Sequence, residues 1–171
     1  MPNTLTKEIK YTAIWGSNFP RLTGFGGKWL AIPMGYMIAN VSFGVSSTPA
    51  TSYTLTVQAD DLNNIIWQPL SSIIVRKCRI YYGQGQSSNT THMIALMRYD
   101  IDADGDLTNG IEMGATASII YSDDYSHVRS TDLTINGDNT VTTNQVLIGM
   151  IMCNTNVNFA VTVKCIIEYT M

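Results

Sequence analysis

The chain has 171 residues, of which 45% are hydrophobic and only 13% are charged, and its formal net charge is −3. This length fits one domain that buries roughly two-thirds of its unfolded surface, so folding needs neither a metal nor a disulfide. The slight negative charge gives no reason to expect nucleic-acid binding, and no apolar run approaches the length that spans a membrane.

Residues 1–28 differ in composition from the rest of the chain. Gly, Asn, Thr and Pro are frequent, and the aromatic residues Trp15, Phe19 and Phe25 stand among them. This composition predicts an extended N-terminal arm with one short strand near residues 8–14. Because an irregular terminus frays unless it is tied down, the arm is expected either to pack on its own domain or to be held by a partner.

From residue 29 onward, apolar and polar residues alternate in one segment after another, which predicts β-strands. Turn residues separate these segments, and Asn136-Gly137 suits a tight hairpin because both residues tolerate positive φ. The last segment is the clearest, since so apolar a face must be built into a sheet. The predicted strands comprise residues 37–45, 53–57, 73–82, 93–99, 115–121, 127–135, 145–153 and 159–169.

Eight or nine strands in one open sheet would leave long edges, so two packed sheets are expected. The predicted fold is therefore all-β: an antiparallel two-sheet jelly-roll sandwich over residues 29–171, preceded by the arm at 1–28. Residues 73–82 and 145–153 carry apolar side chains on both faces, more than a lone sandwich needs. This excess favours assembly with further copies of the chain.

Four aspartates follow one of the predicted strands. Asp100, Asp102, Asp104 and Asp106 stand at alternate positions, as in the opening of a calcium-binding loop. The closing ligand of such a loop is missing, because Ile111 occupies the position of its bidentate Glu. The segment is interpreted either as a solvated acidic turn between strands or as a weak calcium site, and no other cofactor is expected.

The remaining candidates are cysteines, histidines and tyrosines. An odd number of cysteines argues against a complete disulfide framework and predicts buried free thiols. Neither histidine has the spacing of a metal ligand and no catalytic arrangement stands out, so the chain is not expected to be an enzyme. Tyrosines near strand ends belong either to the core or an interface, or to a surface that stacks on sugars. These residues are Cys78, Cys153, Cys165, His92, His127, Tyr81, Tyr82, Tyr99, Tyr121 and Tyr125.

Three features of the strand region resemble a known protein family. They are the opening segment Trp29-Leu-Ala-Ile-Pro-Met-Gly35, the long strand at 73–82 and the closing strand at 159–169. With the polar but weakly charged surface, they resemble a small virion protein of a tailed bacteriophage that has a jelly-roll domain of the tumour-necrosis-factor/C1q-like type. The acidic loop has no counterpart in this resemblance.

The resemblance implies a homotrimeric virion protein that is made in the host cytoplasm. Its implied function is to decorate or stabilise a phage capsid, with the major capsid protein or another virion protein as partner. Trp15, Phe19 and Phe25 are the expected anchors of the arm on the capsid. The alternative is a receptor- or carbohydrate-binding knob of a phage fibre, whose partner is a host-surface glycan.

Overall fold

The computed structural model describes residues 8–19, 26–35, 37–38, 64–84, 90–116, 119–121, 128–154 and 160–171. Within these ranges the regular elements are strands, and there is no helix of the length and apolarity that a membrane crossing requires. The strands are β1 (Tyr11–Phe19), β2 (Trp29–Ala31), β3 (Met37–Ile38), β4 (Ile73–Gln84), β5 (Thr90–Ile101), β6 (Leu107–Ala115), β7 (Ile119–Tyr121), β8 (Arg129–Leu133), β9 (Thr140–Val141), β10 (Gln145–Cys153) and β11 (Val161–Thr170).

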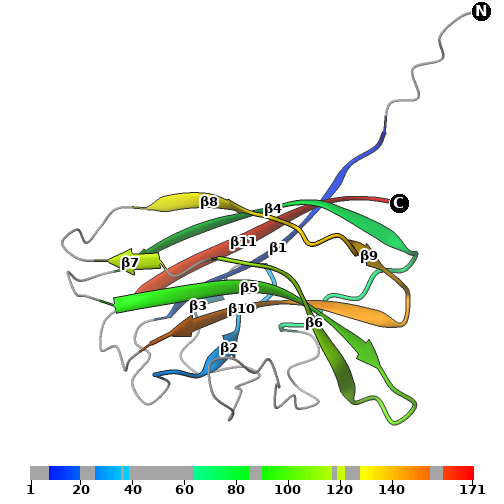
Figure 1. The fold of residues 1–171 in the computed structure, drawn as a ribbon, viewed down its shortest axis with the longest axis horizontal. Coiled ribbons are helices and arrows are strands. Elements are labelled where there is room, and N and C mark those ends of the chain that lie inside the picture. The colour runs from blue at the N-terminus through cyan, green and yellow to red at the C-terminus, as the bar shows by residue number, and fades with distance from the viewer. Residues whose placement is uncertain are drawn as a thin grey trace, which may run out of the picture.

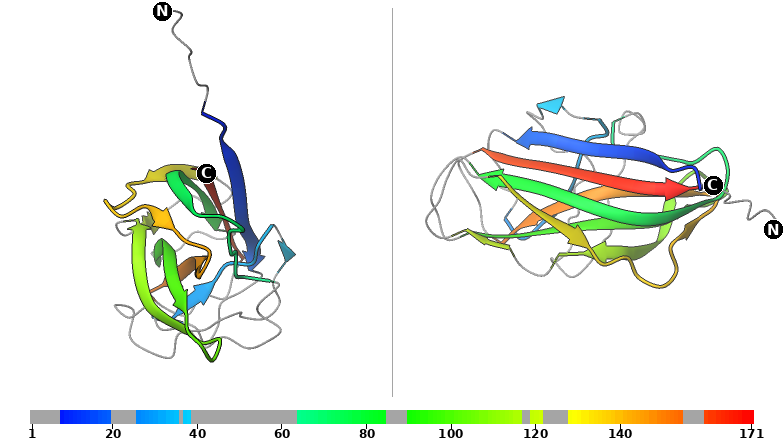
Figure 2. Two further views of the ribbon diagram at one scale, coloured as in Figure 1. Left: turned by 90° about the vertical axis from the view of Figure 1, so that its right-hand side faces the viewer. Right: turned by 90° about the horizontal axis from the view of Figure 1, so that it is seen from above.

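The strands form two sheets that pack face to face (Figure 1). The six-stranded sheet has the order β3-β1-β11-β4-β8, with β9 also paired to β4. The five-stranded sheet has the order β2-β10-β5-β6, with β7 also paired to β5. All pairs are antiparallel except the short β1–β3 pair, which is parallel. The right view of Figure 2 looks onto the six-stranded sheet, with β11 in red between β1 and β4.

The order of pairing is that of a jelly roll. When the short strands β3, β7 and β9 are set aside, eight strands remain, and they pair from the outside of the sequence inward: β1 with β11, β2 with β10, β4 with β8, and β5 with β6. This nesting arises when one long antiparallel hairpin is folded over into two sheets. The all-β, two-sheet jelly-roll prediction is therefore confirmed.

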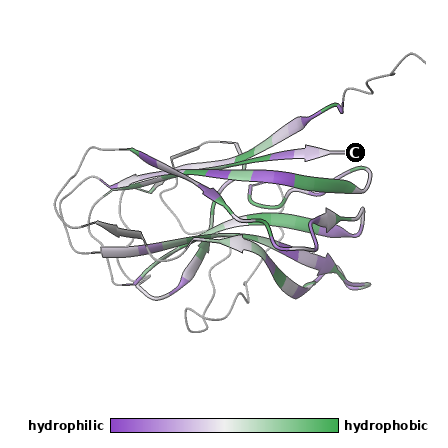
Figure 3. Ribbon diagram, turned by 45° about the horizontal axis from the view of Figure 1, so that its top comes forward, coloured by the Kyte–Doolittle hydropathy of each residue, from purple (hydrophilic) through white to green (hydrophobic). Residues whose placement is uncertain are grey.

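The main core lies between the two sheets. On β11, the side chains of Val161, Val163, Cys165 and Ile167 are buried, while the residues between them are mostly half-buried on the outer face. Hydrophobic bands alternate with paler and hydrophilic residues along the strands in Figure 3. Each fully buried Val or Ile side chain contributes about 1.5–3 kcal/mol relative to an exposed one, so period-two alternation fixes which face points inward.

The segment predicted as part of an arm is a strand of the main sheet. All nine residues of β1 pair with β11, and Trp15 and Phe19 are 0% and 2% exposed. The indole N–H of Trp15 donates a hydrogen bond to the carbonyl oxygen of Ile65 at 3.0 Å. Residues 11–19 therefore belong to the jelly roll, and the expectation that Trp15 and Phe19 anchor the chain on a capsid is corrected: burial has already removed both side chains from contact with any partner. Phe25 lies outside the described residues.

A second apolar layer covers the outer face of the five-stranded sheet. Val146, Ile148, Met150 and Met152 of β10 are buried in it, while the residues between them face the main core. Strand β10 is therefore buried on both faces. Its partners in the second layer include Trp29, Ala31, Ile65, Ala95, Met97 and Tyr99.

This second layer changes the argument for assembly that the sequence suggested. The apolar excess of residues 145–153 is buried within the chain itself, so it offers nothing to another copy. The sequence also predicted apolar side chains on both faces of residues 73–82. In the structure Arg76, Lys77 and Arg79 of β4 are exposed. Homotrimer formation stays a prediction, but it no longer follows from apolar residues on both faces of these two strands.

Candidate binding site on the six-stranded sheet

The outer face of the six-stranded sheet carries side chains from neighbouring strands side by side. Thr162, Lys164 and Ile166 of β11 occupy alternate positions on this face and are half-buried. In the antiparallel register, Lys164 stands opposite Gly16 of β1 on one side and opposite Tyr81 of β4 on the other. Directly opposed side chains of an antiparallel pair have Cβ atoms about 4.5–5.5 Å apart, so Lys164 and Tyr81 are direct neighbours.

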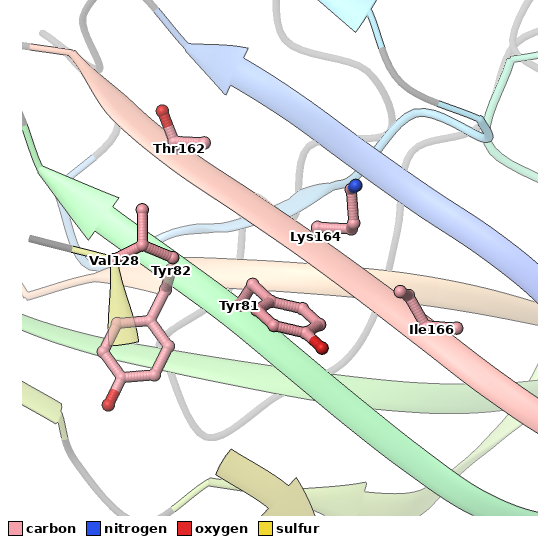
Figure 4. A pocket seen from close by; sticks show the side chains of 6 residues that line it. All are labelled: Tyr81, Tyr82, Val128, Thr162, Lys164 and Ile166. Atoms are coloured by element: carbon pink, nitrogen blue, oxygen red, sulfur yellow. The ribbon is translucent and has the colours of Figure 1, made fainter. Parts of the chain in front are cut away.

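A pocket of about 410 Å³ lies on this part of the sheet. Figure 4 shows Tyr81 beside Lys164 and Ile166, with Thr162 farther along β11 and Val128 next to Tyr82 on the other side of β4. Because Thr162 stands opposite Gly83, β4 contributes no side chain at that register position, which helps to leave the face hollow there. The lining residues are Tyr81, Tyr82, Val128, Thr162, Lys164 and Ile166.

An ion pair stands next to the pocket. Nε and Nη2 of Arg79 donate to the two carboxylate oxygens of Asp132 at 2.7 and 3.0 Å. These hydrogen bonds lower the pKa of Asp132 and raise the pKa of Arg79, to which a hydrogen bond with Tyr81 also contributes. Arg79 and Asp132 therefore neutralise each other. Among the six residues that line the pocket, Lys164 is the charged one.

A buried polar cluster connects the two sheets near one end of the sandwich. Nδ1 of His92 lies 3.0 Å from Sγ of Cys153, and Nε2 lies 3.0 Å from the Thr90 hydroxyl and 3.1 Å from Oε1 of Gln84. The Thr90 hydroxyl donates to the same Oε1 at 2.8 Å. Gln84 belongs to the six-stranded sheet, whereas the other three residues belong to the five-stranded sheet.

This network assigns the tautomer of His92. Oε1 of Gln84 can only accept, so Nε2 of His92 carries the hydrogen, and Nδ1 accepts from the thiol of Cys153. Burial lowers the pKa of His92 to about 4 and raises the pKa of Cys153 to about 12. A neutral imidazole beside a protonated thiol is no activated nucleophile, because nucleophilic cysteines need the thiolate. The cluster joins the sheets and does not form a catalytic pair.

The other two cysteines face each other in the main core. Sγ of Cys78 on β4 and Sγ of Cys165 on β11 are 3.3 Å apart, and both residues are fully buried. Their contact and their burial raise the pKa of Cys78. All three cysteines are free and buried, as expected from the sequence.

The acidic loop joins β5 to β6 and is held by its own hydrogen bonds. The backbone amides of Asp104 and Asp106 both donate to Oδ1 of Asp102, at 3.0 and 2.9 Å. Gly105 adopts a φ of 88°, which a glycine tolerates without strain. Asp100 instead accepts from Gln145 at 2.8 Å and from Asn109 at 3.0 Å, and these bonds lower its pKa.

The loop does not gather its carboxylates around one point. Across the residues that the structure describes, no three His, Cys, Asp or Glu side chains form a group that could hold a metal ion. The carboxylate of Asp100 accepts hydrogen bonds from Gln145 and Asn109, whereas that of Asp102 closes the turn, so these two aspartates serve different local functions. Calcium binding at Asp100, Asp102, Asp104 and Asp106 stays a prediction for titration.

The predicted tyrosines fall into different environments. Tyr81 and Tyr82 line the pocket, whereas Tyr99 is buried in the second apolar layer. Tyr125 and His127 lie outside the described residues, and the side chain of Tyr121 is not described. Sequence reasoning missed Lys164 as the neighbour of Tyr81; aligning the outward positions of the strands at 73–82 and 159–169 in antiparallel register would have shown the pair.

Comparison with known proteins gives only distant similarities. No family model matches the chain, and no curated protein sequence matches it. Two solved structures of infectious bursal disease virus contain similar chains. The Gt strain chain has 9% identity and a TM-score of 0.36, with 96% of this chain and 36% of the viral chain covered. The Gx strain chain has 6% identity and a TM-score of 0.37, with coverages of 100% and 53%.

The chain therefore spans about a third to a half of the viral chains that it resembles. Similarity at this level defines neither a family nor a function.

Proposed function

We propose that this chain is a non-enzymatic structural protein of a virus particle, which decorates or stabilises a phage capsid as a homotrimer. The observation that supports attachment to a larger particle is an apolar surface at one end of the sandwich. Ile9 and Met171 are 68% and 70% exposed, and Leu70 is fully exposed. These three residues are called the end surface.

The three residues belong to the same end of the fold. Strand β11 ends where β1 begins, because the two are antiparallel, which brings residues 9 and 171 to that end. The hydroxyl of Ser71 lies 3.3 Å from Sδ of Met171, so Leu70 is at this end as well.

Two ion pairs lie at the same end of the fold as the end surface. Nζ of Lys10 lies 3.1 Å from Oε1 of Glu168, and Nη2 of Arg76 lies 2.5 Å from Oε1 of Glu8. An apolar centre with a charged rim is the usual arrangement of a protein–protein interface. A soluble protein rarely gathers large exposed apolar side chains without a partner to cover them. Attachment is therefore assigned to Ile9, Leu70 and Met171 in place of the buried Trp15 and Phe19.

The test is attachment to particles that lack the protein. A double variant with Ile9→Asp and Leu70→Asp should fold, because both side chains point into solvent, and should lose most of its particle binding. Val128→Asp is the matched control, since Val128 is 70% exposed but precedes β8 at the other end of the molecule. If the double variant occupies particles as fully as the wild-type protein, the end surface is not the attachment site.

The homotrimer is tested separately by light scattering of the purified chain at micromolar concentration. A trimer mass supports the proposal, and a monomer mass contradicts it.

A second candidate function is that of a receptor- or carbohydrate-binding knob of a phage fibre. The pocket at Tyr81 and Lys164 favours it, because sugar sites commonly combine an aromatic ring with a few hydrogen-bonding groups. A glycan array probed with the fluorescently labelled chain separates the two candidates: a decoration protein binds no glycan, whereas a knob binds a defined set.

A further inference from the structure

Residues 134–139 connect β8 to β9 and bond to both sheets (Figure 1). The backbone N–H and the side-chain Nδ2 of Asn136 donate to two successive carbonyl oxygens of β6, at 2.8 and 2.9 Å. Asn139 accepts from the N–H of Val75 on β4 at 2.9 Å, and its side chain donates to the Val75 carbonyl oxygen at 3.0 Å. Because β6 and β4 belong to different sheets, residues 134–139 are called the bridging segment.

A buried arginine depends on the same segment. Arg98 of β5 is 5% exposed, and its guanidinium donates to Oδ2 of Asp138 at 2.9 Å and to the carbonyl oxygen of Thr140 at 2.5 Å. Its Nε is buried and has no hydrogen-bond partner among the described residues. Removing one member of a buried ion pair is costly, because it leaves the other charge unpaired. Asp138 must therefore stay in place to keep the charge of Arg98 paired.

The middle of the bridging segment is Asn136-Gly137. Asparagine is a thermolabile residue, because the backbone nitrogen that follows it can attack its side-chain amide. Both residues are exposed, and a Cβ at Gly137 would meet no atom within 4 Å. Within the part of the chain that the structure describes, the N–H of Gly137 donates no hydrogen bond. The peptide between the two residues can therefore rotate and bring its nitrogen to Cγ of Asn136.

We propose that Asn136 is a site of spontaneous deamidation in the folded protein. The backbone nitrogen of Gly137 loses its proton and attacks Cγ of Asn136. The new C–N bond closes a succinimide ring, the bond from Cγ to Nδ2 breaks, and the side-chain nitrogen leaves as ammonia. Water then opens the ring at either carbonyl, which gives aspartate or isoaspartate, so that NH is exchanged for O overall.

Either product weakens the bridging segment. A carboxylate at position 136 cannot donate a hydrogen bond to the carbonyl oxygen of Glu112 and repels that oxygen instead. Isoaspartate also adds a methylene group to the main chain, between the bonds of residue 136 to β6 and the ion pair of Asp138 with Arg98. The melting temperature should therefore fall as the modification accumulates.

A second Asn-Gly pair in the chain serves as an internal control. Asn109-Gly110 lies inside β6, and the residues on both sides of it pair with β5. Nδ2 of Asn109 donates to Oδ2 of Asp100 at 3.0 Å, and a Cβ at Gly110 would lie 2.6 Å from the ring of the buried Tyr99. Rotation of this peptide would break the ladder and move Gly110 against that ring. Asn109 should therefore react slowly in the folded chain, although its local sequence is the same.

The experiment is incubation of the full chain for several weeks in mildly alkaline phosphate buffer, followed by digestion at acidic pH, peptide mass mapping and thermal melting. In the folded chain Asn136 should react about tenfold faster than Asn109, whereas in concentrated urea the two should react at similar rates. Gly137→Ala should slow the reaction at Asn136 about tenfold, because its Cβ hinders ring closure but meets nothing in the fold. Freshly purified Asn136→Asp should melt below the wild-type chain.

The other outcomes contradict defined parts of the proposal. Equal rates at Asn136 and Asn109 in the folded chain, or no reaction at Asn136, refute the site. If Asn136 reacts but Asn136→Asp and the incubated chain both melt like the fresh wild-type chain, the effect on the bridging segment is refuted. Incubated Gly137→Ala should keep its melting temperature, and a fall equal to that of the wild-type chain would show that the loss of stability has another cause.

Discussion

Protonation of His92 should destabilise the fold in mildly acidic solution. In the folded chain this side chain is 2% exposed and its pKa is lowered to about 4, whereas an unfolded histidine has a pKa of about 6.5. Between these values the unfolded chain binds a proton that the folded chain does not. The contribution of neutral His92 to the free energy of unfolding is therefore complete well above pH 6.5. It is lost as the pH drops toward 4.

The size of the loss follows from the width of this window. Each pH unit within this window lowers the free energy of unfolding by about 1.4 kcal/mol. Lowering the pH from 7 to 5 should therefore lower it by about 2 kcal/mol. Three aspartates whose pKa values are shifted contribute little in this interval. The pKa values of Asp100, Asp132 and Asp138 are also lowered, but their unfolded pKa is about 3.9, so their share is lost mainly at lower pH.

The assay is urea unfolding at pH 7 and pH 5, for the wild-type chain and for His92→Gln. The wild-type chain should lose about 2 kcal/mol more than the variant between the two pH values, because Gln does not titrate. His127 is present in both proteins, so its contribution cancels in the comparison. If both proteins lose the same free energy, His92 is not the titrating group and the assignment of its buried, neutral tautomer is wrong.

Three further predictions concern the core, the tight packing at Gly114 and the acidic loop. Trp15→Ala should lower the free energy of unfolding by about 3–5 kcal/mol in urea titrations, because it removes a fully buried side chain and its hydrogen bond; an unchanged stability would restore the view of Trp15 as an external anchor. Gly114→Ala places a Cβ 2.7 Å from a backbone oxygen and should cost about 1–3 kcal/mol, whereas Gly137→Ala meets nothing within 4 Å and should change stability by less than about 0.5 kcal/mol. A chelator should leave the melting temperature unchanged if the loop at Asp102 is a solvated turn; a fall that Asp102→Asn abolishes would show bound calcium.

The strand content was predictable where alternation is strict. The segments at 145–153 and 159–169 match β10 and β11 almost residue for residue, since each has a continuous apolar face to bury. The strand β6 was not predicted, because Thr108 to Ile111 lack clean alternation. The register of β6 with β5 also shifts twice, and Asn109 adopts a positive φ of 52° there.

Two segments were misinterpreted because local composition was given more weight than tertiary pairing. Gly16 and the polar residues around it indicated an irregular arm, yet Gly16 lies opposite Lys164 within the β1–β11 ladder. Asn136-Gly137 indicated a tight hairpin, but β8 and β9 on either side of it both pair with β4 instead of with each other. In both cases the partner strand is distant in sequence and overrides the local signal.

The candidate site depends on register, which the sequence does not show directly. Tyr81 and Lys164 become neighbours only through the alignment of β4 with β11. His92 meets Cys153 in the same way, through the alignment of β5 with β10. A spacing search along the chain finds neither pair, because each joins residues from separate strands.

The nested order of the strands has a consequence for synthesis on the ribosome. Strand β1 is made early, but it pairs along its whole length with β11, which is made almost a full chain later. Until β11 leaves the exit tunnel, the backbone N–H and C=O groups along that edge of β1 have no partner strand. The jelly roll therefore closes only after translation has passed β11, and contacts so distant in sequence predict slow folding. Nascent chains that stop before β11 should be captured by chaperones, in contrast to proteins whose first hairpin folds as it emerges.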